Sequence, residues 1–395
     1  MKSVLIILFL FMKSYCAPDF AERARTFSIE LVYFTQQATG GHVVISPLGV
    51  WSLLTGITAG ATQKSRSQLT RALALPGDPE LIRSGYTGLM QAVVDQNTDG
   101  VTLTSKNFLF LDNNFQIRNE FRQTITKDFG AIVQKLNFRD PNAADMANGI
   151  IQNSGANVRN VLQSNDFLTS RMILTNVISF KGFWKSPFEV SDTKVEPFYD
   201  EFKREIGQVN MMNQRNPLPF SNMQNLQARI LELPYGSDDR YSMLIILPYP
   251  KVKASEVYKK FDSVSIPDIF ARLKSDEETY DLEEVNVKLP RFKISTNVVL
   301  NKPLTDMGIV DIFDSRYASF ESVSKEELYV SSIVHKAEIE VTETGTTASA
   351  SSTAHFANRI SPGSFHANKP FIYFIVEKPT ATVLFGGIYS KPSIF

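Results

Sequence analysis

The sequence predicts a mixed α+β fold, because apolar residues recur with a helical period in one stretch and form short runs in others. Residues 176–184 and 241–247 are nearly continuous apolar runs, which are typical of strands buried on both faces. Residues 371–376 and 382–388, separated by a turn containing Pro379, predict a C-terminal hairpin. An amphipathic helix after Pro18 and Asp19 is predicted by apolar residues at spacings of four and three: Phe20, Ala24, Phe27, Leu31 and Phe34. We expect helices to dominate the first half of the chain.

Residues 1–16 are predicted to be a signal peptide. Lys2 precedes an apolar run, and small residues follow at the spacing that signal peptidase requires. A membrane anchor needs about 20 apolar residues, and Lys13 ends the run well short of that length. We therefore expect the protein to be secreted. Cleavage after Cys16 would remove the one cysteine of the sequence, so the mature chain would hold no disulfide.

Residues 17–395 are predicted to form a single domain, because no repeat or composition shift marks a linker. We expect a monomer. The 41 basic and 41 acidic residues balance, which argues against nucleic acid as a partner. No further apolar run is long enough for a membrane span. We interpret two basic groups as solvated faces, with a glycosaminoglycan (heparin) site as the alternative. These groups are Lys64, Arg66 and Arg71, and Lys251, Lys253, Lys259 and Lys260.

The sequence shows no catalytic constellation. Neither a GxSxG elbow nor a phosphate-binding GxGxxG or GxxxxGK motif is present. Carboxylate pairs such as Glu283 and Glu284 are more often solvated than catalytic. The four histidines have no paired metal-ligand spacing such as HExxH: His42, His335, His355 and His366. The sequence therefore predicts no enzyme, no cofactor and no metal site.

The stretch over residues 339–370 fits neither a core strand nor an ordinary loop. Up to about Thr342, apolar and polar residues alternate, which predicts a strand with one buried face. Residues 345–354 are small, uncharged and free of proline, so we expect an exposed and mobile segment. Side chains that small can also enter either face of a sheet. Beyond them Arg359 stands alone in the loop; a disordered insertion is the alternative interpretation.

Several segments, in matching order and spacing, resemble the serpin family. They are ISPLGVWSLL (residues 45–54), NVISFKGFWKSPF (176–188), LPRFKIS (289–295), VHKAEIEV (334–341), EVTETGTTASASS (340–352) and FHANKPFIYFIVEKPTATVLFGGIYSKP (365–392). The resemblance covers almost the whole mature chain. It implies about nine helices, three β-sheets and a mobile reactive-centre loop at about residues 343–364. It also implies a five-stranded main sheet that opens to take the loop as a new strand.

The resemblance assigns roles to particular residues. Trp184 matches the breach, where insertion begins, and Gly49 departs from the family's usual serine at the shutter beneath the sheet. The matching shutter residues are Ser46, Asn176 and His335. The matching hinge residues are Glu343, Gly345, Thr346, Ala348 and Ala350. From the residues alone, His335 is expected to be a hydrogen-bonded structural histidine.

Two family spacings locate the bond that a protease would cut. Sixteen residues on from Glu343, and eleven back from Pro370, both counts reach Arg359. The predicted reactive bond therefore joins Arg359 to Ile360, and its guanidinium suits trypsin-like serine proteases, which would be trapped as a covalent complex. A site after Phe356, for chymotrypsin-like enzymes, is the alternative.

The texture of the sequence resembles that of arthropod extracellular serpins that restrain clotting or melanisation, an innate immunity role. A non-inhibitory serpin (carrier, chaperone or storage protein) and, more remotely, a secreted hydrolase are the alternatives. Non-inhibitory relatives usually place charge or proline where this hinge has Thr346, Ala348 and Ala350. The hinge therefore favours an inhibitor.

Overall fold

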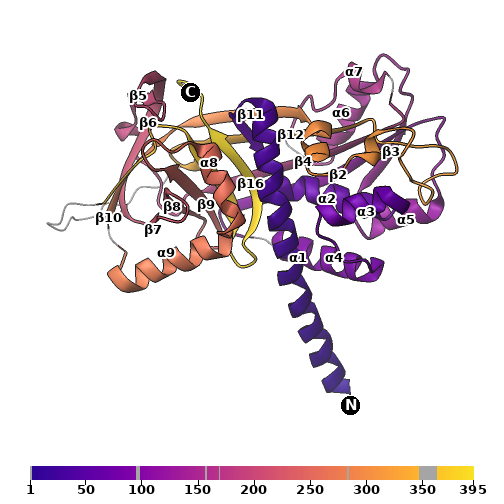
Figure 1. Cartoon of the computed structure of the whole chain (residues 1–395), viewed down its shortest axis with the longest axis horizontal. Coiled ribbons are helices and arrows are strands. Elements are labelled where there is room, and N and C mark those ends of the chain that lie inside the picture. Colours follow the sequence, from indigo (N-terminus) through magenta and orange to yellow (C-terminus); the bar gives the residue numbers. More distant parts are fainter. Residues whose placement is uncertain (1, 95–97, 156–157, 169, 283, 347–362) are drawn as a thin grey trace.

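The computed structural model describes residues 2–94, 98–155, 158–168, 170–282, 284–346 and 363–395, and for residues 2–18 it describes only the backbone. Ten α-helices occur in this part of the chain, close to the number that the resemblance implied (Figure 1). They are α1 (Lys2–Thr39), α2 (Pro47–Thr58), α3 (Gln63–Ala72), α4 (Pro79–Val93), α5 (Asn119–Lys127), α6 (Ala143–Asn153), α7 (Ser164–Phe167), α8 (Ala254–Tyr258), α9 (Ile266–Tyr280) and α10 (Asn301–Asp306). Six of them precede residue 154, as expected for the first half.

The strands form three sheets. The main sheet has the order β11-β12-β4-β2-β3, with the short β13 paired to β4. Its strands are β2 (Val101–Asp112), β3 (Ile132–Leu136), β4 (Met172–Phe183), β11 (Phe292–Val299), β12 (Ser332–Val341) and β13 (Gly345–Thr346). A second sheet, β1-β16-β15-β9-β8-β7, comprises β1 (Val43–Ile45), β7 (Phe220–Met223), β8 (Ala228–Tyr235), β9 (Tyr241–Pro248), β15 (Phe371–Glu377) and β16 (Thr382–Tyr389). The third, β14-β10-β6-β5, comprises β5 (Lys194–Tyr199), β6 (Glu205–Pro217), β10 (Glu284–Pro290) and β14 (Gly363–His366).

The main sheet lies between two apolar layers. On one face α6 and α7 cover it, and there Phe108, Ile173 and Val177 pack with Ala147 and Phe167. The other face joins the larger apolar cluster, which also contains α2 and the second sheet. Every residue of α2 is buried, so this helix fills the space beneath the main sheet. A strand added to the main sheet would therefore bury side chains on both faces.

Most predicted elements are confirmed. The apolar runs are the buried strands β4 and β9, the C-terminal hairpin is β15 with β16, and β12 alternates buried and more exposed residues toward its end. The start of the first helix was predicted wrongly, because α1 begins at Lys2. Asp19 does not begin the helix: its carboxylate pairs with Arg23 one turn later, at 3.0 Å.

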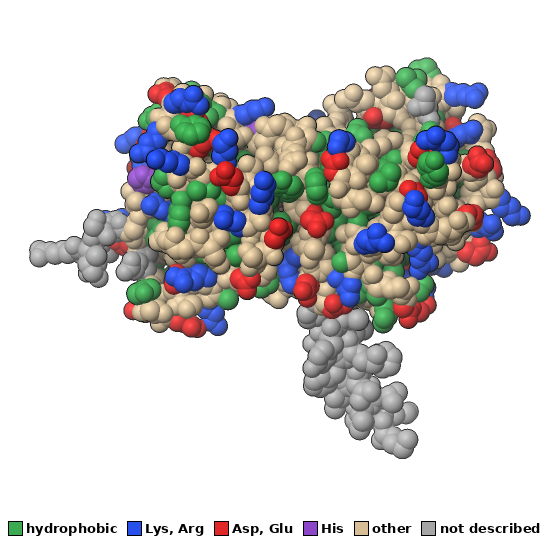
Figure 2. Space-filling view, viewed as in Figure 1, with side chains coloured by type: hydrophobic (Ala, Val, Ile, Leu, Met, Phe, Trp, Pro, Cys, Tyr) green, Lys and Arg blue, Asp and Glu red, His purple; other side chains and the backbone are tan. Residues whose placement is uncertain are grey.

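Charges of both signs are interspersed over the face shown in Figure 2, in keeping with the balanced composition. In the residues searched for spans, no helix has the length and apolar character to cross a membrane.

Candidate functional site: the split main sheet and its hinge

The main sheet is split at one end between its two central strands. β12 and β4 pair in parallel only from Ser332 with Ile173 to Lys336 with Val177. Beyond that point each strand keeps its outer partner, since β12 stays paired with β11 and β4 with β2. A cavity of about 350 Å³ occupies the split, lined by residues 178–181 of β4 and by alternate β12 residues, with Thr346 at its end. The sheet therefore has a ready opening for one more strand.

The hinge already enters this opening. Gly345 pairs with Phe183 and Thr346 with Gly182, so β13 is antiparallel to β4. Gly345 has φ of +140°, and a Cβ there would lie 2.2 Å from the carbonyl oxygen of Gly182, so only glycine fits. Thr346 is 2% exposed. The expectation that the segment is exposed from Gly345 onward is therefore wrong for its first two residues, because their backbone completes hydrogen bonds with β4.

Trp184 fixes the hinge from the side of β4. Its indole Nε1 donates to the carbonyl oxygen of Thr342 at 2.9 Å, and its backbone N–H donates to that of Thr344 at 3.0 Å. The ring stacks on Tyr235 with centroids 4.4 Å apart. Tyr235 in turn shares a hydrogen bond of 3.0 Å with the hydroxyl of Thr346, and burial raises the pKa of Tyr235, which keeps its phenol neutral.

Glu343 anchors the start of the hinge. Its carboxylate, which is nearly buried, accepts a hydrogen bond of 2.7 Å from Thr193 and lies 3.4 Å from the guanidinium of Arg291. Its carbonyl oxygen accepts from the backbone N–H of Phe188 at 2.8 Å. Glu343 and Thr346 are thus both held by hydrogen bonds, and these contacts restrain the two residues between them.

His335 and Ser46 are hydrogen-bonded to each other beneath the main sheet. The backbone N–H of Ser46 donates to Nε2 of His335 at 3.0 Å, and the Ser46 hydroxyl donates to the carbonyl oxygen of Leu384 at 2.7 Å. Burial lowers the pKa of His335 to about 3, so the ring is neutral and its Nε2 lone pair is the acceptor. These contacts tie β12 to the start of α2 and to the second sheet.

Asn176 joins a separate polar chain. Its amide donates to Asn107 of β2 at 2.8 Å, Asn107 donates to Ser52 at 2.8 Å, and Ser52 shares a hydrogen bond of 2.9 Å with Tyr86. Gly49 leaves the room for this arrangement, because a Cβ there would lie 2.0 Å from Oδ1 of Asn176. The side-chain amide of Asn176 therefore occupies the space that a serine side chain at position 49 would need.

Sequence reasoning missed four partners in this region: Asn107, Tyr235, Thr193 and Arg291. Asn107 carried a signal, since it is a polar residue directly before the apolar run at residues 108–111. The predicted hinge residues Ala348 and Ala350, and the predicted reactive bond between Arg359 and Ile360, lie outside the described residues.

Comparison with known proteins defines the class. The chain matches the family described as serpin (serine protease inhibitor) over residues 22–392. It therefore belongs to the serpin family, and the mixed α+β fold with three sheets is the serpin fold.

Among relatives, the chain is 33% identical to leukocyte elastase inhibitor of Bos taurus, covering 93% of this chain and 97% of that protein. It is 34% identical to glia-derived nexin of Homo sapiens, covering 89% and 88%. Among solved structures, native protease nexin-1 with heparin superposes with a TM-score of 0.79 at 28% identity, covering 95% of this chain and 100% of that one. The relatives' names are those of protease inhibitors.

Proposed function

We propose that this serpin is a secreted suicide substrate that traps trypsin-like serine proteases. The protease attacks the carbonyl carbon of Arg359 and forms an acyl-enzyme while the amine of Ile360 leaves. The freed loop then continues the insertion that β13 begins and carries the ester-linked protease with it. Residues 345–359 span 14 steps. At about 3.4 Å for each step, the bait residue would move by roughly 45 Å or more.

The observation that carries this proposal is the hinge in the split sheet. Gly345 and Thr346 already pair with β4, and the cavity beyond them separates β4 from β12. The next residues to enter would be small and uncharged, so no buried charge opposes their insertion. Inhibition requires that the loop inserts before the acyl-enzyme is hydrolysed. A hinge that is already paired at the entrance of the sheet should make insertion faster.

A non-inhibitory role is the second candidate, and one fold neighbour illustrates it. Human thyroxine-binding globulin complexed with thyroxine superposes with a TM-score of 0.81, but at 21% identity this likeness concerns the fold alone. The uncharged hinge favours the inhibitor instead.

The experiment mixes purified protein with trypsin and looks for a complex that survives SDS. Arg359→Ala should abolish the complex and leave the melting temperature unchanged, because it removes the charged anchor of the bait and little else. Thr353→Ala, which also lies in the loop, is the control and should keep the complex. Equal complex formation by Arg359→Ala and wild type would contradict the assigned bait.

The proposal includes one further partner, a glycosaminoglycan such as heparin. Protease nexin-1 was solved with heparin, and α3 here presents basic side chains. However, Lys64 pairs with Asp311 at 3.5 Å and Lys253 with Glu201 at 3.7 Å, which weakens both basic groups. The test compares the rate of trypsin inhibition with and without heparin. If heparin does not raise this rate, a glycosaminoglycan partner is excluded.

Secretion rests on the predicted signal peptide. N-terminal sequencing of protein exported by insect or mammalian cells should begin at Ala17. Retention of the chain inside the cells would contradict it.

A further inference from the structure

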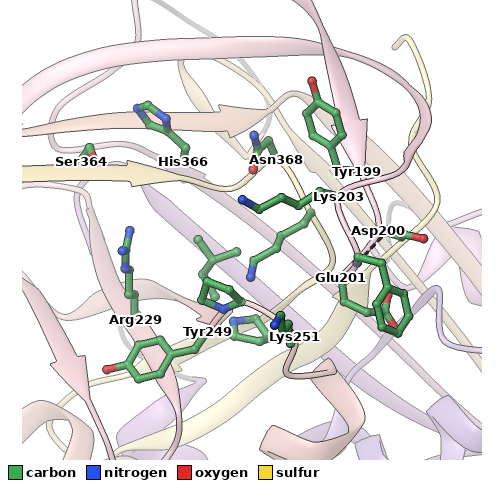
Figure 3. A pocket seen from close by; sticks show the side chains of 15 residues that line it. Tyr199, Asp200, Glu201, Lys203, Arg229, Tyr249, Lys251, Ser364, His366 and Asn368 are labelled. Carbon is green, nitrogen blue, oxygen red and sulfur yellow. Dashed lines mark hydrogen bonds between the residues drawn. The ribbon is translucent and has the colours of Figure 1, made fainter.

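A cavity of about 580 Å³ lies outside the hinge region and has no part in the proposed inhibition (Figure 3). Its lining comes from three places: the turn after β5, the ends of β8 and β9 that adjoin each other, and β14 with the residues that follow it. Cavities that bind small molecules usually have volumes of about 300–1,000 Å³. The size alone is therefore suitable for a ligand.

Four cationic side chains line this cavity: Lys203, Arg229, Lys251 and Lys369. Within the described part of the chain, none of the four makes an ion pair or a side-chain hydrogen bond. In Figure 3, Arg229 and Lys203 lie on opposite sides of the cavity. Burial, followed by the neighbouring charge of Arg229, lowers the pKa of Lys369 to about 8. The cations thus repel each other across a partly dry space, and an anion between them would relieve that repulsion.

The two carboxylates in the lining offset these four cations only in part: Glu201 raises the pKa of Lys369, but by less than burial and Arg229 lower it. Asp200 accepts backbone hydrogen bonds from Phe202 at 2.8 Å and Arg204 at 2.9 Å, and its second oxygen pairs with the Arg204 side chain at 2.7 Å. Glu201 forms its ion pair with Lys253, at 3.7 Å. Both acids are therefore engaged with their own neighbours, and the cavity keeps an excess of positive charge.

The rest of the lining combines apolar side chains with five polar ones: Tyr199, Tyr249, Ser364, His366 and Asn368. Leu247, Pro248 and Pro250 contribute hydrocarbon surface, and Phe202 adds a ring that is 60% exposed. The hydroxyl of Tyr249 is buried and has no hydrogen-bond partner among the described residues. Because that hydroxyl is shielded from solvent, Tyr249 contributes its ring to the lining.

We propose that this cavity is a binding site for a small amphipathic anion, with a carboxylate, sulfate or phosphate head between Arg229 and Lys369 and an apolar or aromatic body against Leu247 and the prolines. The concave shape favours a small molecule over a flat macromolecular surface. Because β14 directly follows the reactive-centre loop in the chain, the ligand would bridge that segment to the second sheet.

The test uses two fluorescent probes that differ only in the anionic group. 8-Anilinonaphthalene-1-sulfonate carries a sulfonate, and N-phenyl-1-naphthylamine is the same aromatic body without it. We expect one saturable site per chain for the sulfonate, at least tenfold tighter than for the neutral probe. Equal affinity for the two probes, or no saturable sulfonate binding, would overturn the proposal.

Variants locate the site. Arg229→Gln combined with Lys369→Gln should weaken sulfonate binding at least tenfold and change neutral-probe binding less than twofold. Each single variant should weaken it at least threefold, which keeps the test decisive if the double variant does not fold. Lys259→Gln removes an exposed lysine outside the cavity and is the matched control. Wild-type sulfonate affinity in the folded single variants would show that the probe binds elsewhere.

Discussion

The substitution Thr346→Arg tests whether insertion through the split sheet decides inhibition. The Thr346 side chain is 2% exposed and shares a hydrogen bond of 3.0 Å with Tyr235, which itself stacks on Trp184. A guanidinium at this position has to leave water, and the carboxylates that line the same cavity, Glu338 and Glu340, are already paired with Lys293. The effective penalty for burying an unpaired ion in a protein is several kcal/mol.

The magnitude follows from the rate equation. If about 3 kcal/mol of that penalty is felt during insertion, insertion slows by roughly 150-fold, because each 1.36 kcal/mol changes a rate tenfold. Hydrolysis of the acyl-enzyme is chemistry within the protease and should keep its rate. The variant should therefore be cleaved and released as a substrate, while wild type is trapped.

The assay is titration of trypsin, with the products separated in SDS. We expect the SDS-stable complex of Thr346→Arg to disappear and the number of inhibitor molecules consumed per protease to rise at least tenfold. Thr346→Ser keeps the hydroxyl that bonds Tyr235 and should behave as wild type. Wild-type complex yield and stoichiometry for Thr346→Arg would refute the reasoning.

Three further predictions concern stability. His335 has a folded pKa of about 3, below its ordinary value of 6.5, so at acid pH the unfolded chain binds more protons than the folded chain. As the pH falls from 6.5 to 5, this residue should therefore lower the free energy of unfolding by about 2 kcal/mol. In urea titrations, the free energy of unfolding of His335→Gln should depend less on pH than that of wild type. Gly49→Ala should lose about 1–3 kcal/mol in the same assay because its Cβ displaces Asn176, whereas Gly88→Ala, with open space around it, should not lose stability. Cleavage after Arg359 should raise the melting temperature by more than about 10 °C, because roughly ten new ladder hydrogen bonds of about 1 kcal/mol each would form; an unchanged melting curve would argue against insertion.

The sequence predicted the individual helices and strands better than the contacts between them. Local patterns sufficed for β4, β9 and the C-terminal hairpin, because apolar runs and alternation report burial directly. Pairings such as Trp184 with Thr342, separated by 158 residues, depend on how β4 and β12 approach each other. No local pattern encodes that approach, so these contacts came only with the structure.

The hinge shows the same limit. Small side chains predicted that the segment after Gly345 could enter a sheet, but not that two residues have already done so. That outcome depends on the split between β4 and β12 and on the hydroxyl of Tyr235, which lies 111 residues away from Thr346 in the chain. At Gly49, likewise, the sequence showed a departure from the family, and the structure showed the Asn176 amide that occupies the space.

The most direct test of the account is mass spectrometry of the products formed with trypsin. A single cut between Arg359 and Ile360 should release a peptide of residues 360–395, while residues up to 359 stay covalently bound to the protease in an SDS-stable complex. The account predicts that this peptide and the complex appear together and in equal amounts. Full inhibition with a peptide that begins elsewhere, or cleavage at this bond without a covalent complex, would contradict it.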